Sequence, residues 1–224
     1  MRKIISSLFI TILLFSLCAC ENSNSSKKES VPDIPVTPAS DFEYSEHEGE
    51  IILNKYLKDD EYISVPEEID NKKVTTIGIM CFSGKSMREI IIPDTVTKIS
   101  DNAFWGCGNL RNIYWSDNIT EFGTEAFYAC RKLLIDNLPK KLEILGSECF
   151  MENESITKIT IPASLTEIGE GSFGSSVVTA KFLGDAPETL GNRPFDETTI
   201  IYYKKDAKGW DTTPLRDNYT LEAY

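Results

Sequence analysis

Residues 90–110 read IIIPDTVTKISDNAFWGCGNL, and this stretch decides the fold because its pattern recurs along the chain. Phenylalanines mark the recurrence with spacings of 22, 23, 23 and 23 residues, at Phe82, Phe104, Phe127, Phe150 and Phe173. An apolar residue lies five positions before each of them, at Ile77, Ile99, Phe122, Leu145 and Ile168. A fixed period of this length indicates a repeat architecture. We call each repeat a rung, and the equivalent positions of successive rungs a column.

Within a rung, single apolar residues at every third position suit a coil that turns repeatedly and sends one side chain inward from each short edge. Alternation appears only in segments such as Ile113-Tyr114-Trp115, which predicts a short strand. Stacked rungs would place these strands side by side, ~4.8 Å apart, in a parallel sheet. Glycine directly follows the apolar column described above in four rungs, at Gly78, Gly123, Gly146 and Gly169.

The composition suits a globular protein. Of 224 residues, 41% are hydrophobic and 26% are charged, which excludes a wholly disordered chain. Lys and Arg number 23 against 35 for Asp and Glu, so the net charge is -12 and nucleic acid is disfavoured as a partner. The single histidine, His47, excludes histidine-rich metal sites.

The N-terminus is predicted to be a targeting segment. Arg2 and Lys3 precede an apolar run, residues 4–17, that would span roughly 21 Å as a helix, less than the ~30 Å hydrocarbon layer. Residues 1–19 therefore indicate a signal peptide. The following Leu17-Cys18-Ala19-Cys20 resembles a bacterial lipobox, which implies acylation of Cys20 and a lipid anchor. An ordinary secretory signal that happens to end in cysteine is the alternative.

Residues 20–40 are rich in Ser, Asn and Pro and poor in apolar residues. Such a segment cannot bury enough surface to order itself, so we expect a disordered tether between Cys20 and the folded part.

The phased columns resemble the BspA-like leucine-rich repeats of bacterial surface proteins, and the resemblance covers the chain from Phe42 to its C-terminus. It implies a right-handed, β-rich leucine-rich repeat solenoid, with a parallel strand in each rung, short helical or irregular turns and a cap at each end. The boundaries expected from it are 41–66 for an N-terminal hairpin cap, 67–182 for the rungs and 183–224 for a degenerate last rung and C-terminal cap. Leu190 and Phe195 continue the inward columns weakly.

Four cysteines lie in the repeats. Cys81 and Cys149 precede a column phenylalanine, three rungs apart, whereas Cys107 and Cys130 occupy adjacent rungs. In leucine-rich repeats this second column, which continues at Asn153, takes Asn or Cys side chains that satisfy backbone groups of the turn. Buried structural thiols are the first interpretation, and a Cys107–Cys130 disulfide is the alternative.

No catalytic pattern accounts for the chain. Gly-x-Ser-x-Gly and phosphate-loop motifs are absent from the sequence, and His47 lies between two glutamates of the cap. Glu125 and Glu148 share a column and could form a carboxylate pair, although repeats generate such ladders automatically. We therefore expect no enzyme, no cofactor and no metal site.

Two surfaces are candidates for partner binding. The column after the phenylalanines contains Trp105, Tyr128 and Met151 on consecutive rungs, which predicts either a contact stripe or a ridge folded over its own rung edges. The second candidate is the outer face of the short strands, with Ile91, Tyr114, Asn137 and Thr160. Asp136 interrupts the inward column there, so a shift of strand register is expected in an unknown direction.

These features favour a lipid-anchored protein of the bacterial envelope, surface-exposed or periplasmic, that contacts the membrane only through its lipid. A solenoid without a cleft suits a protein ligand, and the resemblance implies adhesion to host or bacterial proteins. A glycan-binding lipoprotein that stacks sugars on Trp105, Tyr128 or Tyr114 is the alternative.

Overall fold

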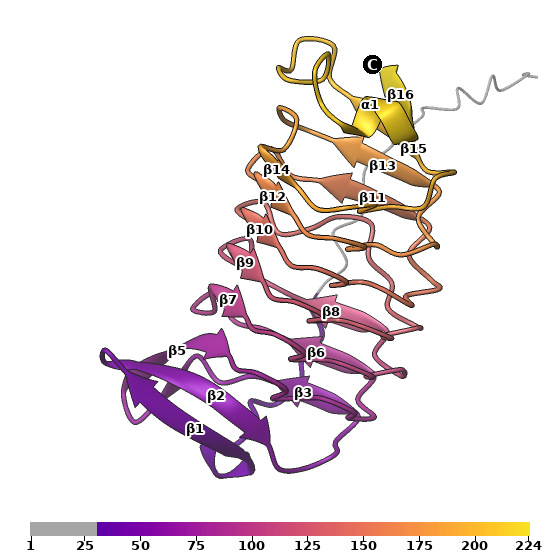
Figure 1. Cartoon of the computed structure of the whole chain (residues 1–224). Coiled ribbons are helices and arrows are strands. Elements are labelled where there is room, and N and C mark those ends of the chain that lie inside the picture. Colours follow the sequence, from indigo (N-terminus) through magenta and orange to yellow (C-terminus); the bar gives the residue numbers. More distant parts are fainter. Residues whose placement is uncertain (1–30) are drawn as a thin grey trace, which may run out of the picture. The chain divides into compact units, whose positions relative to one another are not determined.

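The computed structural model describes residues 31–224 (Figure 1). The signal peptide of residues 1–19, the acylation of Cys20 and the first part of the expected tether lie outside the described residues. The end of the expected tether is ordered, contrary to the prediction for residues 20–40: Thr37 is buried and its N–H donates to the carbonyl of Ser64 at 2.9 Å. From Val31 onward the chain forms one compact unit.

This unit is a solenoid of short strands joined by irregular turns, with very little helix. A 3-10 turn, Ala39–Asp41, precedes the strands, and one short helix, α1 (Leu215–Asn218), lies near the C-terminus. The strands are β1 (Phe42–His47), β2 (Glu50–Tyr56), β3 (Tyr62–Ser64), β4 (Glu68–Ile69), β5 (Lys72–Ile77), β6 (Glu89–Ile91), β7 (Lys98–Ile99), β8 (Asn112–Tyr114), β9 (Glu121–Phe122), β10 (Ile144–Leu145), β11 (Lys158–Ile161), β12 (Glu167–Ile168), β13 (Thr179–Phe182), β14 (Thr189–Leu190), β15 (Ile200–Tyr203) and β16 (Thr220–Ala223).

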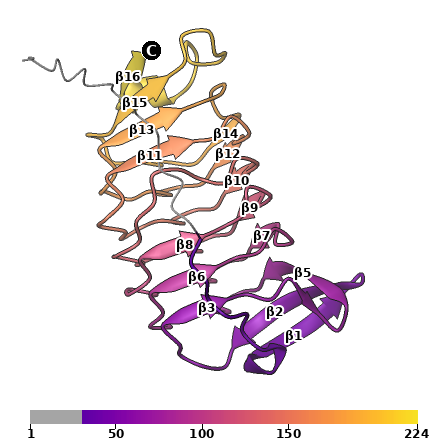
Figure 2. The same ribbon diagram turned by 180° about the vertical axis from the view of Figure 1, so that it is seen from behind.

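The strands form two walls of the coil. One wall is a nine-stranded sheet with the order β1-β2-β5-β7-β9-β10-β12-β14, in which β4 also pairs with β5. The other wall holds the sheets β3-β6-β8 and β11-β13-β15-β16 (Figure 2). Apart from the β1–β2 and β4–β5 pairs, which are antiparallel, the described strands pair in parallel, as the stacked rungs predict.

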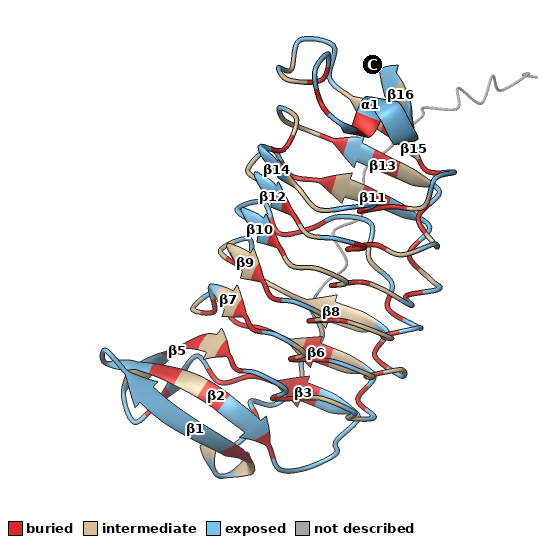
Figure 3. Ribbon diagram, viewed as in Figure 1, coloured by how far each residue is buried: buried red, intermediate tan, exposed pale blue. Residues whose placement is uncertain are grey.

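Between the walls lies a core built from the sequence columns. The column phenylalanines are buried and stack ring on ring, with centroids 5.1 Å apart for Phe82 and Phe104 and 5.0 Å for Phe104 and Phe127. The series extends to Phe195, whose ring lies 4.8 Å from that of Phe173 at an angle of 3°. Figure 3 shows the buried residues following the inner side of the coil. The columns are thus the core.

The glycine column is explained by the close approach of neighbouring rungs. A Cβ added at Gly146 would lie 2.4 Å from the carbonyl carbon of Gly123, and one at Gly169 would lie 2.3 Å from the backbone nitrogen of Ser147. Any side chain at these two positions would collide with the backbone of the preceding rung, so they require glycine. The rung of Ile99 is the exception in this column, since Ser100 makes the equivalent bond between rungs there, from its N–H to the carbonyl of Ile77 at 2.9 Å.

Aromatic side chains close the two ends of the core, as the expected caps require. At the N-terminal end, Phe42 and Tyr56 of the β1–β2 hairpin pack against the ring of Phe82. At the C-terminal end, Trp210 packs on Phe182 with centroids 4.9 Å apart, and Tyr219 meets Phe195 edge to face.

The interruption at Asp136 removes a strand without shifting the register. Residues 135–137 form no strand, and only the bridge between Asn137 and Thr160 continues the ladder. Asp136 is exposed, and Ile135 packs against the core beside it. A carboxylate at an inward position would lose its hydration, so the backbone turns it outward and divides this wall into two sheets.

The cysteine interpretation is confirmed, because all four cysteines in residues 31–224 are buried free thiols. The Sγ of Cys107 donates to the carbonyl of Phe82 at 3.0 Å, and Cys130 donates likewise to Phe104 at 3.2 Å. In the same column, the amide of Asn153 donates to the carbonyl of Phe127 at 2.8 Å. This column therefore satisfies a backbone carbonyl in the turn of the preceding rung.

Candidate interaction surface

The aromatic ridge, defined as Trp105, Tyr128 and Met151, lies on the turns that follow β7, β9 and β10. In each turn a backbone N–H donates to the carbonyl three residues earlier, as Trp105 N–H does to the carbonyl of Asn102 at 3.0 Å. The tight turn sends the column phenylalanine inward and the next side chain outward. Trp105 is consequently 42% exposed, whereas Tyr128 and Met151 are half-buried.

Trp105 and Tyr128 stack on each other across adjacent rungs. Their ring centroids lie 6.1 Å apart and their planes differ by 11°. Met151 continues the ridge, and the next position of the column is Gly174, where the ridge ends. The Met151 side chain lies over this glycine, since a Cβ at Gly174 would lie 2.9 Å from the Met151 sulfur. The ridge therefore combines both interpretations: it covers its own rung edges and still presents an aromatic surface to solvent.

Charged groups around the ridge hold Tyr128 in place. The Tyr128 hydroxyl donates to Glu152 Oε1 at 3.0 Å, and Arg131 Nη2 donates to Glu152 Oε2 at 2.7 Å. The hydrogen bond to Glu152 raises the pKa of Tyr128, and nearby Glu148 and Glu125 add to this effect. Arg131 and then Tyr128 lower the pKa of Glu152. The ridge thus has an acidic border. The sequence indicated the ladder of Glu125 and Glu148, but its position beside the ridge and the part of Glu152, which follows Met151 directly, were missed.

The outer strand face is less continuous than the sequence suggested. Ile91 and Tyr114 are register partners on β6 and β8, whereas Asn137 bridges to Thr160 beyond the break in the sheet. The Asn137 amide donates to the neighbouring Asp136 carboxylate at 2.6 Å. The structure therefore brings these candidate residues together as two pairs.

Of the residues considered for chemistry, Glu125 and Glu148 lie near Tyr128 of the ridge, whereas His47 lies in the N-terminal hairpin. The His47 side chain is 74% exposed at the end of β1, and Glu125 accepts a hydrogen bond from the Asn102 amide at 2.8 Å. In the part of the chain that the structure describes, no group of three or more His, Cys, Asp or Glu residues could hold a metal ion. Within residues 31–224, no helix is long and apolar enough to cross a bilayer.

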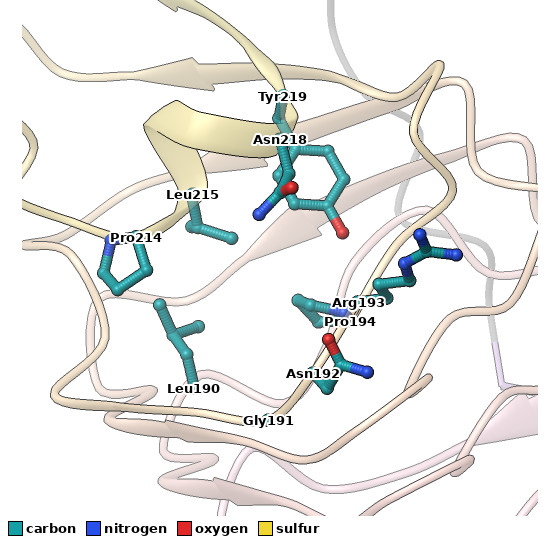
Figure 4. A pocket seen from close by; sticks show the side chains of 9 residues that line it. All are labelled: Leu190, Gly191, Asn192, Arg193, Pro194, Pro214, Leu215, Asn218 and Tyr219. Carbon is teal, nitrogen blue, oxygen red and sulfur yellow. The ribbon is translucent and has the colours of Figure 1, made fainter.

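A pocket of about 310 Å³, absent from the sequence predictions, lies between the last turn of the repeats and the C-terminal cap (Figure 4). It is lined by Leu190, Gly191, Asn192, Arg193, Pro194, Pro214, Leu215, Asn218 and Tyr219. The sequence indicated this region only through the phenylalanine column, which ends at Phe195.

Comparison with protein families identifies the repeats. The model of the BspA type leucine rich repeat region matches residues 61–200 in six copies, which is more than half of the chain. The chain belongs to this family. The six copies extend past the five phenylalanines of the regular series to the rung of Phe195. A leucine-rich repeat fold of the BspA type is typically non-catalytic and suggests a role in protein interaction.

Solved structures place the BspA-type chain among bacterial repeat proteins. A leucine-rich repeat protein of T. pallidum is 25% identical, with a TM-score of 0.63 over 75% of this chain and 86% of that one. A leucine-rich cell surface protein of Faecalibacterium prausnitzii A2-165 shares the fold, with 20% identity and a TM-score of 0.54. This second match covers 79% of this chain and 56% of the Faecalibacterium protein. A comparison with curated proteins gives no match.

Proposed function

We propose that this BspA-type protein is a protein-interaction module of the bacterial cell surface, and that the aromatic ridge is its contact surface. The observation that carries the proposal is the exposed stack of Trp105 on Tyr128, continued by Met151. Aromatic side chains provide a large contact area at a small cost in conformational entropy, and they dominate the energetics of many interfaces.

The acidic border of the ridge supports a partner with basic side chains. Glu125, Glu148 and Glu152 surround Tyr128, and Arg131 neutralises only part of their charge. Lys or Arg side chains of a partner would gain attraction both from these carboxylates and from the aromatic faces.

A protein partner fits the ridge better than a sugar does. Because Trp105 and Tyr128 stack on each other, each ring has one face already covered. A sugar could stack only on the remaining face of each ring, whereas a protein partner also uses ring edges and the flanking charges.

The anchoring part of the proposal rests on the sequence. Acylation of Cys20 would fix the chain to the membrane, and residues 21–36, which precede the contact of Thr37 with Ser64, would hold the solenoid away from the lipid. The proposed role is then adhesion to host or bacterial proteins, with residues 41–66 and 183–224 capping the rungs between them.

Binding measurements on a ridge variant test the proposal. Both proteins to be compared carry Cys20→Ala, which blocks acylation, and one of them, the ridge variant, also carries Trp105→Ala and Tyr128→Ala. Their binding is measured on immobilised lysine-rich peptides and on intact bacteria. The matched control carries Leu134→Ala and Val178→Ala, two exposed apolar residues outside the ridge.

The ridge variant is expected to lose at least about tenfold in binding to both targets, since aromatic hot spots contribute roughly 2 kcal/mol or more. The control is expected to bind normally. Equal binding of the ridge variant and the control would refute the assignment of the ridge. Hits on a glycan array that disappear in the ridge variant would instead favour the sugar-binding alternative.

A further inference from the structure

The ladder of backbone hydrogen bonds between rungs stops at the last turn of the repeats. In the preceding rungs, Gly191 N–H donates to the carbonyl of Ile168 at 2.7 Å, and Gly171 N–H donates to the carbonyl of Asn192 at 3.1 Å. The equivalent groups one rung later are the carbonyl of Leu190 and the N–H of Arg193. Neither forms a hydrogen bond within residues 31–224.

The Arg193 backbone keeps the geometry of the regular rungs. Its φ of 45° lies in the left-handed region, as do the φ values of Glu125 and Glu148, both 53°, at the same column position. Those two N–H groups donate to the next rung, at 2.8 Å each. The unpaired N–H of Arg193 is therefore directed to the place where a further rung would lie.

The C-terminal cap satisfies only part of this open edge. The Tyr219 hydroxyl donates to the carbonyl of Phe195 at 2.9 Å and accepts a hydrogen bond from Phe195 N–H at 3.3 Å. Tyr219 thus replaces the next rung at Phe195. Strand β14 pairs with β12 on one side, and in the described part of the chain no strand pairs with its other side.

The pocket lies at this uncovered edge and combines apolar walls with free polar groups. Leu190 and Leu215 point toward one another across it, and Pro194 and Pro214 complete the apolar lining (Figure 4). The carboxamides of Asn192 and Asn218 make no hydrogen bond within residues 31–224. The guanidinium of Arg193 pairs with Glu197 at 3.0 Å, so it is not committed to the pocket.

We propose that this pocket binds an extended peptide segment of a partner protein, which adds to the free edge of β14. Strand addition of this kind uses backbone hydrogen bonds for affinity and side-chain pockets for specificity. The N–H of one peptide residue donates to the Leu190 carbonyl, and the carbonyl of the following residue accepts from Arg193 N–H. These contacts repeat those that Gly191 and Asn192 make to the rung before them.

The rung geometry also specifies the peptide sequence. A Cβ at Gly191 would lie 2.1 Å from the backbone nitrogen of Glu170, and every rung from Gly78 to Gly191 has glycine at this position except that of Ser100. We therefore expect glycine at the equivalent position of the peptide. The residue before that glycine continues the inward column of Ile168 and Leu190, and its side chain enters the apolar space beside Leu215. The preferred ligand is therefore an uncharged segment with an aliphatic residue followed by glycine.

Peptide titration of the full chain carrying Cys20→Ala tests this site. The probe is the capped pentapeptide Thr-Thr-Ile-Gly-Ile, which has the sequence of residues 75–79, and the comparison peptide is Thr-Thr-Ile-Ala-Ile. Backbone amide shifts in NMR spectra report the binding site and the affinity. We expect a saturable shift of the Arg193 amide and at least tenfold weaker binding of the alanine peptide.

Two tryptophan variants separate pocket filling from a general effect. Asn218→Trp, at an exposed position of the lining, fills the pocket and is expected to weaken binding at least tenfold, whereas Asn109→Trp, on an exposed turn of another rung, leaves it unchanged. Urea unfolding establishes that both variants fold.

The proposal is overturned by equal affinity for the glycine and alanine peptides, by the absence of a saturable shift at millimolar peptide, or by unchanged binding in Asn218→Trp. A shift of Arg193 that depends on protein concentration alone would assign the edge to a second copy of the chain, and would also overturn it. The pocket lies apart from the aromatic ridge. A negative result for the pocket therefore leaves the proposed function of the ridge unaffected, and a negative result for the ridge leaves the pocket proposal unaffected.

Discussion

Replacing Gly146 with alanine tests whether successive rungs lie directly on one another. Gly146 is outside the left-handed region, so its backbone would accept alanine, but the new Cβ would lie 2.4 Å from the Gly123 carbonyl carbon. That is about 1 Å short of the ~3.5 Å carbon contact. Overpacking of this kind costs roughly 1–3 kcal/mol, and weakening the Gly146 N–H bond to the Phe122 carbonyl adds about 1 kcal/mol. We expect Gly146→Ala to lower the free energy of unfolding by about 2–4 kcal/mol.

Gly108→Ala is the matched control. Gly108 also lies outside the left-handed region, and its added Cβ would meet no atom closer than 3.9 Å. Alanine there should stabilise by about 0.4–1 kcal/mol, because it restricts the unfolded chain. Urea unfolding of both variants gives the two free energies. The stacking argument would be refuted if the free energy of unfolding changed in the same direction in both variants, or if it fell by less than about 1 kcal/mol in Gly146→Ala.

Two further predictions concern the core. Phe127 is buried between Phe104 and Phe150, with centroids 5.0 and 5.3 Å away, so Phe127→Ala should cost about 3–5 kcal/mol in urea unfolding. A loss under about 1 kcal/mol would contradict its place in the core. Burial raises the pKa of the Cys81 thiol from 9.0 to about 12, so folding favours the protonated thiol. The stabilisation from the protonated Cys81 thiol is complete below pH 9.0 and is lost as the pH rises toward 12. The free energy of unfolding, measured from about pH 8 to 11, should therefore decline less in Cys81→Ala than in the unaltered chain. Identical pH profiles of the two proteins would count against this assignment.

The core was predictable because equivalent positions of successive rungs have the same surroundings, so the same residue type recurs at each of them. Each phenylalanine of the column is buried against its neighbours in adjacent rungs, and the sixth, Phe195, follows the same geometry. The buried thiols were predictable for the same reason, since Cys107 and Cys130 share a column with Asn153 and a similar hydrogen bond.

Departures from the pattern were harder to predict. Asp136 marked an interruption in the sequence, but only the structure shows that the strand is lost while Asn137 stays in register. Trp105 and Tyr128 were adjacent in one column, yet their stacking and the bond to Glu152 depend on side-chain rotamers, which a column does not specify.

By itself the sequence determined the period, the inward columns and the recurrence of glycine beside one of them, because residues that recur at one spacing occupy one repeated environment. The tertiary structure alone decided how the ridge packs and where the backbone ladder is left open. Those features depend on distances between different rungs and on the cap, where Tyr219 covers Phe195 but the groups of Leu190 and Arg193 have no next rung to meet.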